Sequence, residues 1–212
     1  MKGWITSQTA DHFRLPLRMQ LAEMIPQESK FLEVGCGTGD LFYLLSQKIS
    51  FGLGLEKSQP LVRFAQQKMR KQEIRNVAIR RARFPETLSY VAKFDVGLAS
   101  LFFSNLTADK AEDTLKKMGE LCSEILIAEF DPLHKMKRAK LIADSVGWFD
   151  KENYKAFRRS GGVEALAERC GMQITQRTEG PYKGLFIYTL VQELRVKQEV
   201  AERSKRPMYS KV

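Results

Sequence analysis

The chain has 212 residues, a length typical of one domain, and such a domain buries roughly 70% of its unfolded surface without cross-links. Its apolar fraction of 43% and charged fraction of 28% are ordinary, which excludes a disordered or collagen-like protein. Three widely spaced cysteines without a C-x-x-C pair exclude a disulfide framework and favour a reducing, cytoplasmic location. We expect no signal peptide and no membrane span, since no apolar stretch approaches the ~20 residues that a span requires.

The formal net charge of +10 raises the question of an anionic partner, such as a nucleic acid or a membrane surface. The basic residues form small groups, without the regularly interleaved aromatic residues on which bases stack. We therefore expect a solvated positive surface and keep nucleic-acid binding as an alternative. The groups are Arg80, Arg81 and Arg83; Lys135, Lys137, Arg138 and Lys140; Arg158 and Arg159; and Arg203, Lys205, Arg206 and Lys211.

Hydrophobic spacing predicts an alternation of strands and helices along the chain. After a first helix over 16–25, expected strands cover 31–34, 51–55, 77–79, 94–99 and 125–128, with helices over 41–45, from Ser58 to Met69, and over 109–121. Two helical stretches at 136–146 and 163–170, the second stopped by Gly171, then precede a hairpin of strands 172–177 and 184–191 joined by a Gly-Pro turn. Because parallel strands need crossover helices, this order predicts an α/β protein with a mostly parallel sheet.

The most informative segment is Glu33-Val34-Gly35-Cys36-Gly37-Thr38-Gly39-Asp40, between a predicted strand and a predicted helix. Glycine allows a tight turn and lets a ligand approach where a Cβ would collide. The helix that follows offers unpaired amides and a partial positive charge, which suit a carboxylate or phosphate. The segment therefore predicts a ligand-binding turn.

An acid at the end of the second strand, Glu56, indicates which ligand the turn binds. A carboxylate there can accept both hydroxyls of a ribose. A dinucleotide fingerprint G-x-G-x-x-G would need glycine at position 40, where Asp40 stands instead and would repel a pyrophosphate. The turn and Glu56 therefore predict a nucleoside with a charged or polar extension that is not a dinucleotide's pyrophosphate.

The segment E-V-G-C-G-T-G, together with Glu56, resembles the first signature of the class I S-adenosylmethionine-dependent methyltransferases. The resemblance extends over about residues 30–192. Within the family, the chain is most similar to compact, type 11-like members. It implies a Rossmann-like, doubly wound sheet of seven strands with an antiparallel C-terminal strand and helices on both faces. The implied organisation is one domain over 1–195, with an N-terminal helical cap at 1–29, the core at 30–192 and a basic, mobile tail at 196–212.

The resemblance implies S-adenosyl-L-methionine as cofactor, S-adenosyl-L-homocysteine as product and no metal. The family often has an aspartate where Arg83 stands, which accepts a hydrogen bond from the adenine amino group. In this sequence either the Arg83 guanidinium stacks and backbone atoms take that polar contact, or the alignment shifts by one residue. Glu33 has two interpretations, contact with the methionine end of the cofactor or pairing with a backbone amide. The implied cofactor-binding residues are Glu33, Gly35, Cys36, Gly37, Gly39, Glu56, Lys57, Ala82, Arg83, Phe84 and Ser100.

The sequence identifies the residues that would bind the methyl acceptor less clearly than those that would bind the cofactor. It assigns no catalytic base. His12 and His134 are the two histidines and titrate near neutral pH, although either could be a surface or capping residue. Phe102 and Trp148 could line an apolar acceptor pocket or belong to the core.

We expect a small-molecule acceptor, of a quinone or secondary-metabolite type. Two alternatives stay open: methylation of RNA or protein, suggested by the positive charge, and a non-catalytic subunit that binds an adenosyl ligand. The base-methylating motif Asn/Asp-Pro-Pro-Tyr/Phe is absent after the fourth strand, where Ser100-Leu101-Phe102-Phe103 stands.

Overall fold

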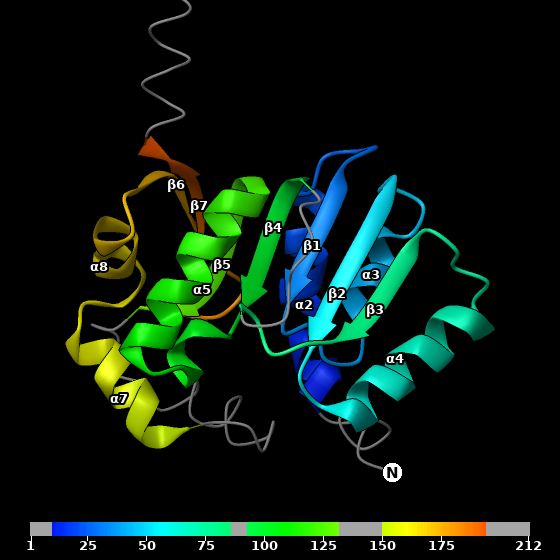
Figure 1. The fold of residues 1–212 in the computed structure, drawn as a ribbon, viewed down its shortest axis with the longest axis horizontal. Coiled ribbons are helices and arrows are strands. Elements are labelled where there is room, and N and C mark those ends of the chain that lie inside the picture. Colours follow the sequence, from blue (N-terminus) through cyan, green and yellow to red (C-terminus); the bar gives the residue numbers. More distant parts are fainter. Residues whose placement is uncertain (1–9, 86–92, 132–149, 194–212) are drawn as a thin grey trace, which may run out of the picture.

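The computed structural model of the chain describes residues 10–85, 93–131 and 150–193. Its strands form one seven-stranded sheet in the order β3-β2-β1-β4-β5-β7-β6 (Figure 1). The strands are β1 (Lys30–Val34), β2 (Phe51–Glu56), β3 (Val77–Arg81), β4 (Phe94–Ser100), β5 (Cys122–Phe130), β6 (Met172–Glu179) and β7 (Leu185–Gln192). Strand β7 runs antiparallel to both its neighbours, and the other pairs are parallel. The predicted α/β fold with an antiparallel C-terminal strand is confirmed.

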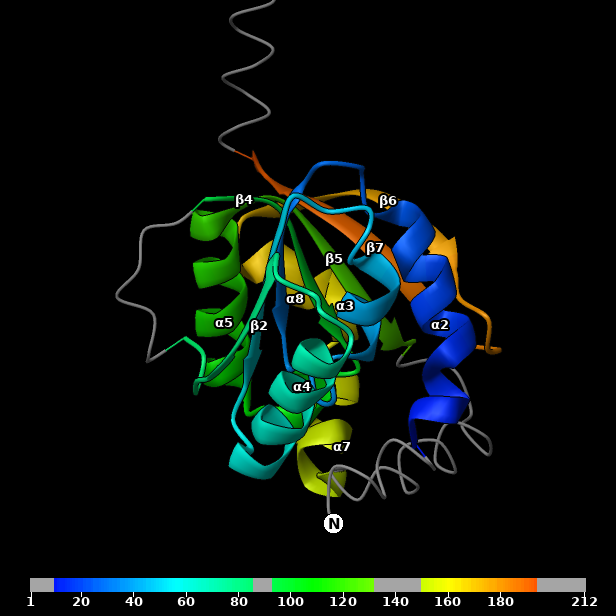
Figure 2. The same ribbon diagram turned by 90° about the vertical axis from the view of Figure 1, so that its right-hand side faces the viewer.

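Helices cover both faces of this sheet, so the structure has three layers (Figure 2). The helices are α2 (Ala10–Met24), α3 (Asp40–Leu45), α4 (Gln59–Lys71), α5 (Ala108–Leu121), α7 (Lys151–Arg159) and α8 (Gly162–Arg169), with a short 3-10 helix η1 at Phe103–Asn105. Helices α2, α3 and α4 pack on one face, and α5, α7 and α8 pack on the other.

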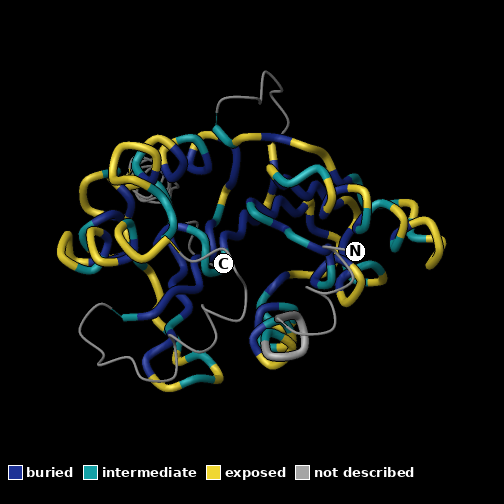
Figure 3. Tube along the Cα trace, turned by 90° about the horizontal axis from the view of Figure 1, so that it is seen from below, coloured by how far each residue is buried: buried dark blue, intermediate teal, exposed yellow. Residues whose placement is uncertain are grey.

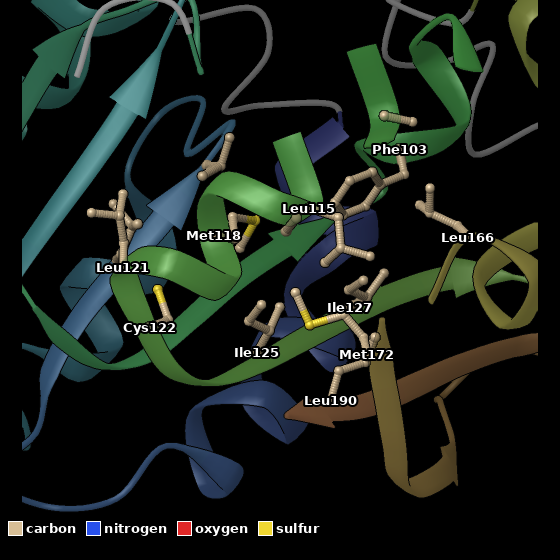
Figure 4. Packing of buried hydrophobic residues seen from close by; sticks show 14 of the residues in the cluster. Phe103, Leu115, Met118, Leu121, Cys122, Ile125, Ile127, Leu166, Met172 and Leu190 are labelled. Atoms are coloured by element: carbon tan, nitrogen blue, oxygen red, sulfur yellow. The ribbon is translucent and has the colours of Figure 1, made fainter. Parts of the chain in front are cut away.

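The alternation of side chains along each strand divides the core into two apolar clusters. In β5, Ile125 and Ile127 contact the helix layer of α5, whereas Leu126 and Ala128 point to the layer of α2. Figure 4 shows the first cluster, in which Met118 and Leu115 of α5 lie over the strands. Because both faces are covered, the central strands are mostly apolar, as is typical of parallel sheets.

Two glycines in β2 let helix α3 and its loop lie close to the sheet. A Cβ at Gly52 would lie 2.7 Å from Cε1 of Phe42, and a Cβ at Gly54 would lie 2.8 Å from Sγ of Cys36. The small residues of β2 therefore fix the distance between the sheet and the segment that follows β1.

Three local predictions need correction. The first helix begins earlier than expected, at Ala10, and accommodates Pro16 inside it. A helix over Lys151–Arg159 was not predicted, because its polar composition hides the two residues that it buries, Tyr154 and Phe157. Ser58 does precede helix α4, but within the described residues its side chain makes no capping hydrogen bond. The predicted helix at 136–146 lies outside the described residues.

The carboxyl ends of the parallel strands meet at one edge of the sheet, which Figure 3 shows from below. The loops after β1, β2, β3 and β4 all lie at this edge. In α/β proteins of this kind ligands bind outside the carboxyl ends of the strands, near the point where the strand order reverses. Here the reversal falls between β1 and β4. Within the described part of the chain, no helix has the length and apolar character needed to cross a membrane.

Candidate functional site

The turn between β1 and α3 is built on glycines with positive φ. Gly35, Gly37 and Gly39 have φ values of 80°, 56° and 71°. Residues with a Cβ adopt such values only at an energetic cost, so three of them close together strongly favour glycine in this turn. At Gly37 an added Cβ would meet no described atom within 4 Å. The backbone of Gly37 is thus open to a ligand.

The carboxylate of Glu56 links the end of β2 to this turn. Its Oε2 accepts a hydrogen bond from the Gly37 amide at 3.2 Å, and its Oε1 accepts one from the Ser58 amide at 2.7 Å. The side chain is only 6% exposed, and burial raises its pKa above the usual value, while the two amides favour the charged form. Glu56 therefore holds an acceptor-only group beside Gly37, as the sequence predicted for a ribose.

The carboxylate of Asp40 is paired with other groups of the protein, whereas the sequence analysis expected its charge to act on a ligand. Its Oδ2 accepts hydrogen bonds from the Thr38 hydroxyl at 2.8 Å and from the Arg18 guanidinium at 3.0 Å. Its Oδ1 contacts the ammonium of Lys68. Two cations thus offset the charge that was expected to repel a pyrophosphate, so the argument against a dinucleotide rests on the missing glycine alone. Asp40 instead ties the glycine turn to α2 and α4.

Glu33 is buried in the middle of the sheet, one residue before the end of β1. It is 7% exposed, and its Oε2 has no hydrogen-bond partner among the described residues. Burial raises its pKa to about 7, partly offset by the positive charge of Arg18. An uncompensated buried carboxyl is costly to keep, which suggests a purpose other than stability.

The segment after β3 lies against the end of β2. The amide of Ala82 donates a hydrogen bond to the carbonyl oxygen of Glu56 at 3.1 Å. Lys57 and Arg83 are exposed, and Phe84 is half-buried against the core. The structure therefore places the predicted adenine-side residues, including Arg83, next to the predicted ribose acid.

Ser100 and Phe102 complete this edge from the side of β4. Ser100 is the last residue of β4, next to Ala128 of β5. The ring of Phe102 lies against the glycine turn, since a Cβ at Gly35 would be 2.6 Å from its Cδ2. Phe102 also makes an edge contact with Phe103, with ring centroids 5.8 Å apart. The observed position of Phe102 is against the glycine turn, and its role toward an acceptor stays a prediction.

Sequence reasoning missed one residue of this edge, Glu129 near the end of β5. It is 1% exposed and accepts a hydrogen bond from the Ser104 amide at 3.1 Å. Burial raises its pKa to about 7, whereas hydrogen bonds from Ser104, Phe103 and Phe102 oppose the shift. Glu129 thus holds the turn that carries Phe102. The signal in the sequence was an acid directly after the apolar run Ile125-Leu126-Ile127-Ala128.

Of the remaining predicted residues Cys36, His12, His134 and Trp148, the structure describes the side chain of Cys36 alone. Cys36 is buried against Gly54, and this burial raises the pKa of its thiol, as expected for a small packing residue. His12 belongs to helix α2, where its side chain is not described. His134 and Trp148 lie outside the described residues. In the described ranges, no cluster of His, Cys, Asp or Glu side chains could hold a metal ion.

Comparison with known proteins agrees with this geometry. A family profile described as "Methyltransferase domain" matches residues 25–162, well over half of the chain. The chain therefore belongs to the methyltransferase-domain family, and the predicted class, an S-adenosylmethionine-dependent methyltransferase with a Rossmann-like sheet, is confirmed. No curated protein matches the chain at a significant level.

Solved structures share the fold at low sequence identity. A SAM-dependent methyltransferase from Aquifex aeolicus is 15% identical with a TM-score of 0.67, and the match covers 90% of this chain and 97% of that one. The O-methyltransferase NcsB1 from neocarzinostatin biosynthesis, crystallised with S-adenosylmethionine and 2-hydroxy-5-methyl naphthoic acid, is 16% identical with a TM-score of 0.65. That match covers 89% of this chain but 56% of NcsB1, so this chain spans about half its length.

A third match shows that the fold does not select the acceptor. The ribosomal protein L11 methylase from Lactobacillus delbrueckii subsp. bulgaricus is 13% identical with a TM-score of 0.57, covering 85% of this chain and 79% of that one. That enzyme is a methylase of a ribosomal protein, whereas NcsB1 was crystallised with a small aromatic acid.

The buried carboxyl of Glu33 generates a prediction about stability and pH. A folded-state pKa of about 7, above the usual 4.5, means that the folded protein retains a proton that the unfolded chain releases. The wild type therefore loses stability as the pH rises from about 4.5 to about 7. Glu33→Gln does not titrate, so its free energy of unfolding should exceed that of the wild type above pH 7, by as much as about 3 kcal/mol, and match it near pH 4.5.

Urea unfolding at pH 5 and pH 8 measures this difference, with the exposed Glu168→Gln as the matched control that should change neither value. Equal stability of Glu33→Gln and wild type at both pH values would contradict a buried, weakly compensated carboxyl.

The contact between Glu129 and the η1 turn generates a second prediction. Glu129→Leu removes the acceptor for the buried Ser104 amide, so we expect a loss of about 1–3 kcal/mol in the free energy of unfolding at neutral pH. Glu124→Leu, the same change at a half-buried carboxyl of the same strand, serves as the control and should cost less. If both substitutions had equal effects in urea unfolding, Glu129 would not anchor this turn.

Proposed function

We propose that this methyltransferase transfers a methyl group from S-adenosylmethionine to a small-molecule acceptor. The observation that carries the proposal is the turn at Gly37, whose backbone is open to a ligand and adjoins the buried Glu56 carboxylate. This arrangement lies where the strand order reverses, which is the binding position that the fold favours.

The residues present fit the cofactor. The unpartnered Oε2 of Glu33 suits the ammonium of an amino-acid tail, and the amides of the glycine turn suit its carboxylate. Glu56 would accept hydrogen bonds from the ribose hydroxyls. The adenine would lie beside Ala82, Arg83 and Phe84, with Lys57 at its rim and with Gly35, Cys36, Gly39 and Ser100 completing the site.

The chemistry needs orientation more than acid or base groups. When bound, S-adenosylmethionine supplies a methyl group already activated by its sulfonium. What the chain contributes is a fixed turn and buried carboxylates that hold both reactants in line and exclude water. Such orientation is worth roughly 7–11 kcal/mol in favourable cases, so the lack of an assigned base is compatible with catalysis.

A small acceptor is supported by the likeness to NcsB1, whose crystals contain a small aromatic acid. The acceptor would approach from the β4 and β5 side of the edge, where Phe102 lies. His12, His134 and Trp148 stay proposed acceptor residues. One domain over 1–195 with a tail over 196–212 is part of the same proposal.

Cofactor binding is the first test. By calorimetry, wild type should bind S-adenosylhomocysteine, Gly37→Val should lose binding because its side chain enters the open space at the turn, and Glu56→Ala should bind about 10–100-fold more weakly. Gly171→Val is a matched control, since Gly171 also has a positive φ of 65° and open space around its Cβ but lies at the junction of α8 and β6. It should lose stability and keep binding.

Two outcomes would count against the cofactor site. Wild-type protein that is folded and binds neither S-adenosylmethionine nor S-adenosylhomocysteine would reject it. Equal loss of binding in Gly37→Val and Gly171→Val would show that unfolding, not the site, explains the effect.

The second test identifies the class of molecule that accepts the methyl group. The protein is incubated with S-adenosylmethionine carrying a radiolabelled methyl group and, separately, with a protein-free metabolite extract, total RNA or total protein, with heat-denatured protein as the control. We expect label in the metabolite fraction. Label confined to RNA or protein would contradict a small acceptor, and cofactor binding without transfer to any fraction would indicate a non-catalytic binder.

A further inference from the structure

The positive charge of this chain is concentrated in one segment. Residues 57–83 contain nine Lys or Arg residues and a single acid, Glu73, so this segment carries +8 of the formal net charge of +10. The other residues together carry +2, because acids elsewhere offset the basic groups at 135–140 and 203–211. A chain that only needed solubility could distribute its charge, so the concentration requires its own explanation.

The fold brings eight of these cations to the surface on α4, on β3 and on the loops next to them. We call them the α4–β3 basic face, and its exposed members are Lys57, Arg63, Arg70, Lys71, Arg75, Arg80, Arg81 and Arg83. Helix α4 buries Val62, Ala65 and Met69 against the sheet. Arg63 and Arg70, seven residues apart, therefore lie on the same outer side of the helix.

Helix α4 and strand β3 are neighbours at one end of the sheet (Figure 1). Strand β3 is the end strand of the sheet, and its Arg80 and Arg81 are both exposed. Arg81 donates a hydrogen bond to the carbonyl oxygen of Lys57 at 3.4 Å, which joins the face across the β2–α4 loop. Because successive residues of a strand point to opposite faces, Arg80 and Arg81 lie on opposite sides of β3, and the cations surround this end of the sheet.

Edge protection explains only part of this surface. Charged residues on an end strand prevent pairing with other chains, which accounts for Arg80 and Arg81. Helix α4 has no such edge, yet its outer side carries Arg63, Arg70 and Lys71. A role in binding an anion covers both elements.

We propose that the α4–β3 basic face is a docking surface for the phosphate backbone of single-stranded RNA. Six of its eight cations are arginines, whose planar guanidinium matches phosphate oxygens with two hydrogen bonds. A run of such groups over a helix and a strand suits a repeating chain of phosphates more than a single anion. Contacts to phosphates carry no information about the bases, so we expect binding without sequence preference.

The same face is poorly suited to a lipid surface. Helices that lie on membranes expose large apolar side chains beside their cations. The large hydrophobic residues exposed in the described part of the chain are Leu15, Met19, Tyr43, Leu44 and Phe51, none of which belongs to α4 or β3.

The docking surface is distinct from the acceptor side of the site. It includes Lys57 and Arg83, which are proposed to lie beside the adenine, and it adjoins the ends of β2 and β3, whereas the acceptor side lies by β4 and β5. Bound RNA would therefore not occupy the acceptor position, and this inference stands independently of the proposed small-molecule acceptor.

Fluorescence anisotropy with a labelled poly(U) RNA of about 20 nucleotides tests the surface. We expect binding at about 50 mM KCl that weakens steeply as salt is added, because phosphate contacts release counterions. The triple variant Arg63→Gln/Arg70→Gln/Lys71→Gln should bind about tenfold more weakly or worse, and the slope of log K against log salt should shrink by about 2. Glutamine keeps helix propensity, and none of the three residues belongs to the cofactor site.

The control removes the same charge elsewhere: Lys110→Gln/Lys116→Gln/Lys151→Gln changes exposed residues of α5 and α7 and should bind RNA almost as wild type. Both variants should keep S-adenosylhomocysteine binding, which shows that each is folded. Three results would overturn the proposal: no RNA binding at low salt, equal loss in both triple variants, or binding of phosphatidylserine vesicles or polyglutamate but not RNA. Methyl transfer into poly(U) would overturn the small-molecule acceptor and leave the docking surface intact.

Discussion

The structure depends on the backbone turn that takes the chain from the central strand β1 into helix α3. Three glycines with positive φ make the turn, and the small residues Gly54 and Cys36 let it lie close to β2. Asp40 then fixes it to α2 and α4 through Arg18 and Lys68. A turn held from three sides can leave the Gly37 backbone open without collapsing, and this openness is what makes a binding site.

Buried carboxyl groups at the same edge differ in how far the protein itself compensates them. Glu33 and Glu129 both have pKa values raised to about 7 by burial, and burial also raises that of Glu56. Glu56 and Glu129 are compensated by backbone amides of the turns they hold, whereas Glu33 retains an unpartnered oxygen. The difference separates carboxylates that position the loops from one whose partner would be a ligand.

Much of the fold was predictable because its strands are apolar runs and its turn is marked by glycines. The predicted ligand turn, Glu56 and the C-terminal hairpin were found at the expected places in the fold. Helix α7 was missed because it buries only Tyr154 and Phe157, and Glu129 was missed because its role depends on a contact between separate strands. The environment of Asp40 was also unpredictable, since Arg18 lies 22 residues away in sequence.

The central claim is that the turn after β1 and the acid after β2 hold one cofactor. A crystal structure of the chain grown with S-adenosylhomocysteine tests it most directly. The account predicts electron density for the amino-acid tail against the turn from Gly35 to Gly39 and for the ribose hydroxyls on Glu56. Density elsewhere on the protein, or a Glu56 carboxylate that stays on the Gly37 amide while the ribose lies apart from it, would contradict the account.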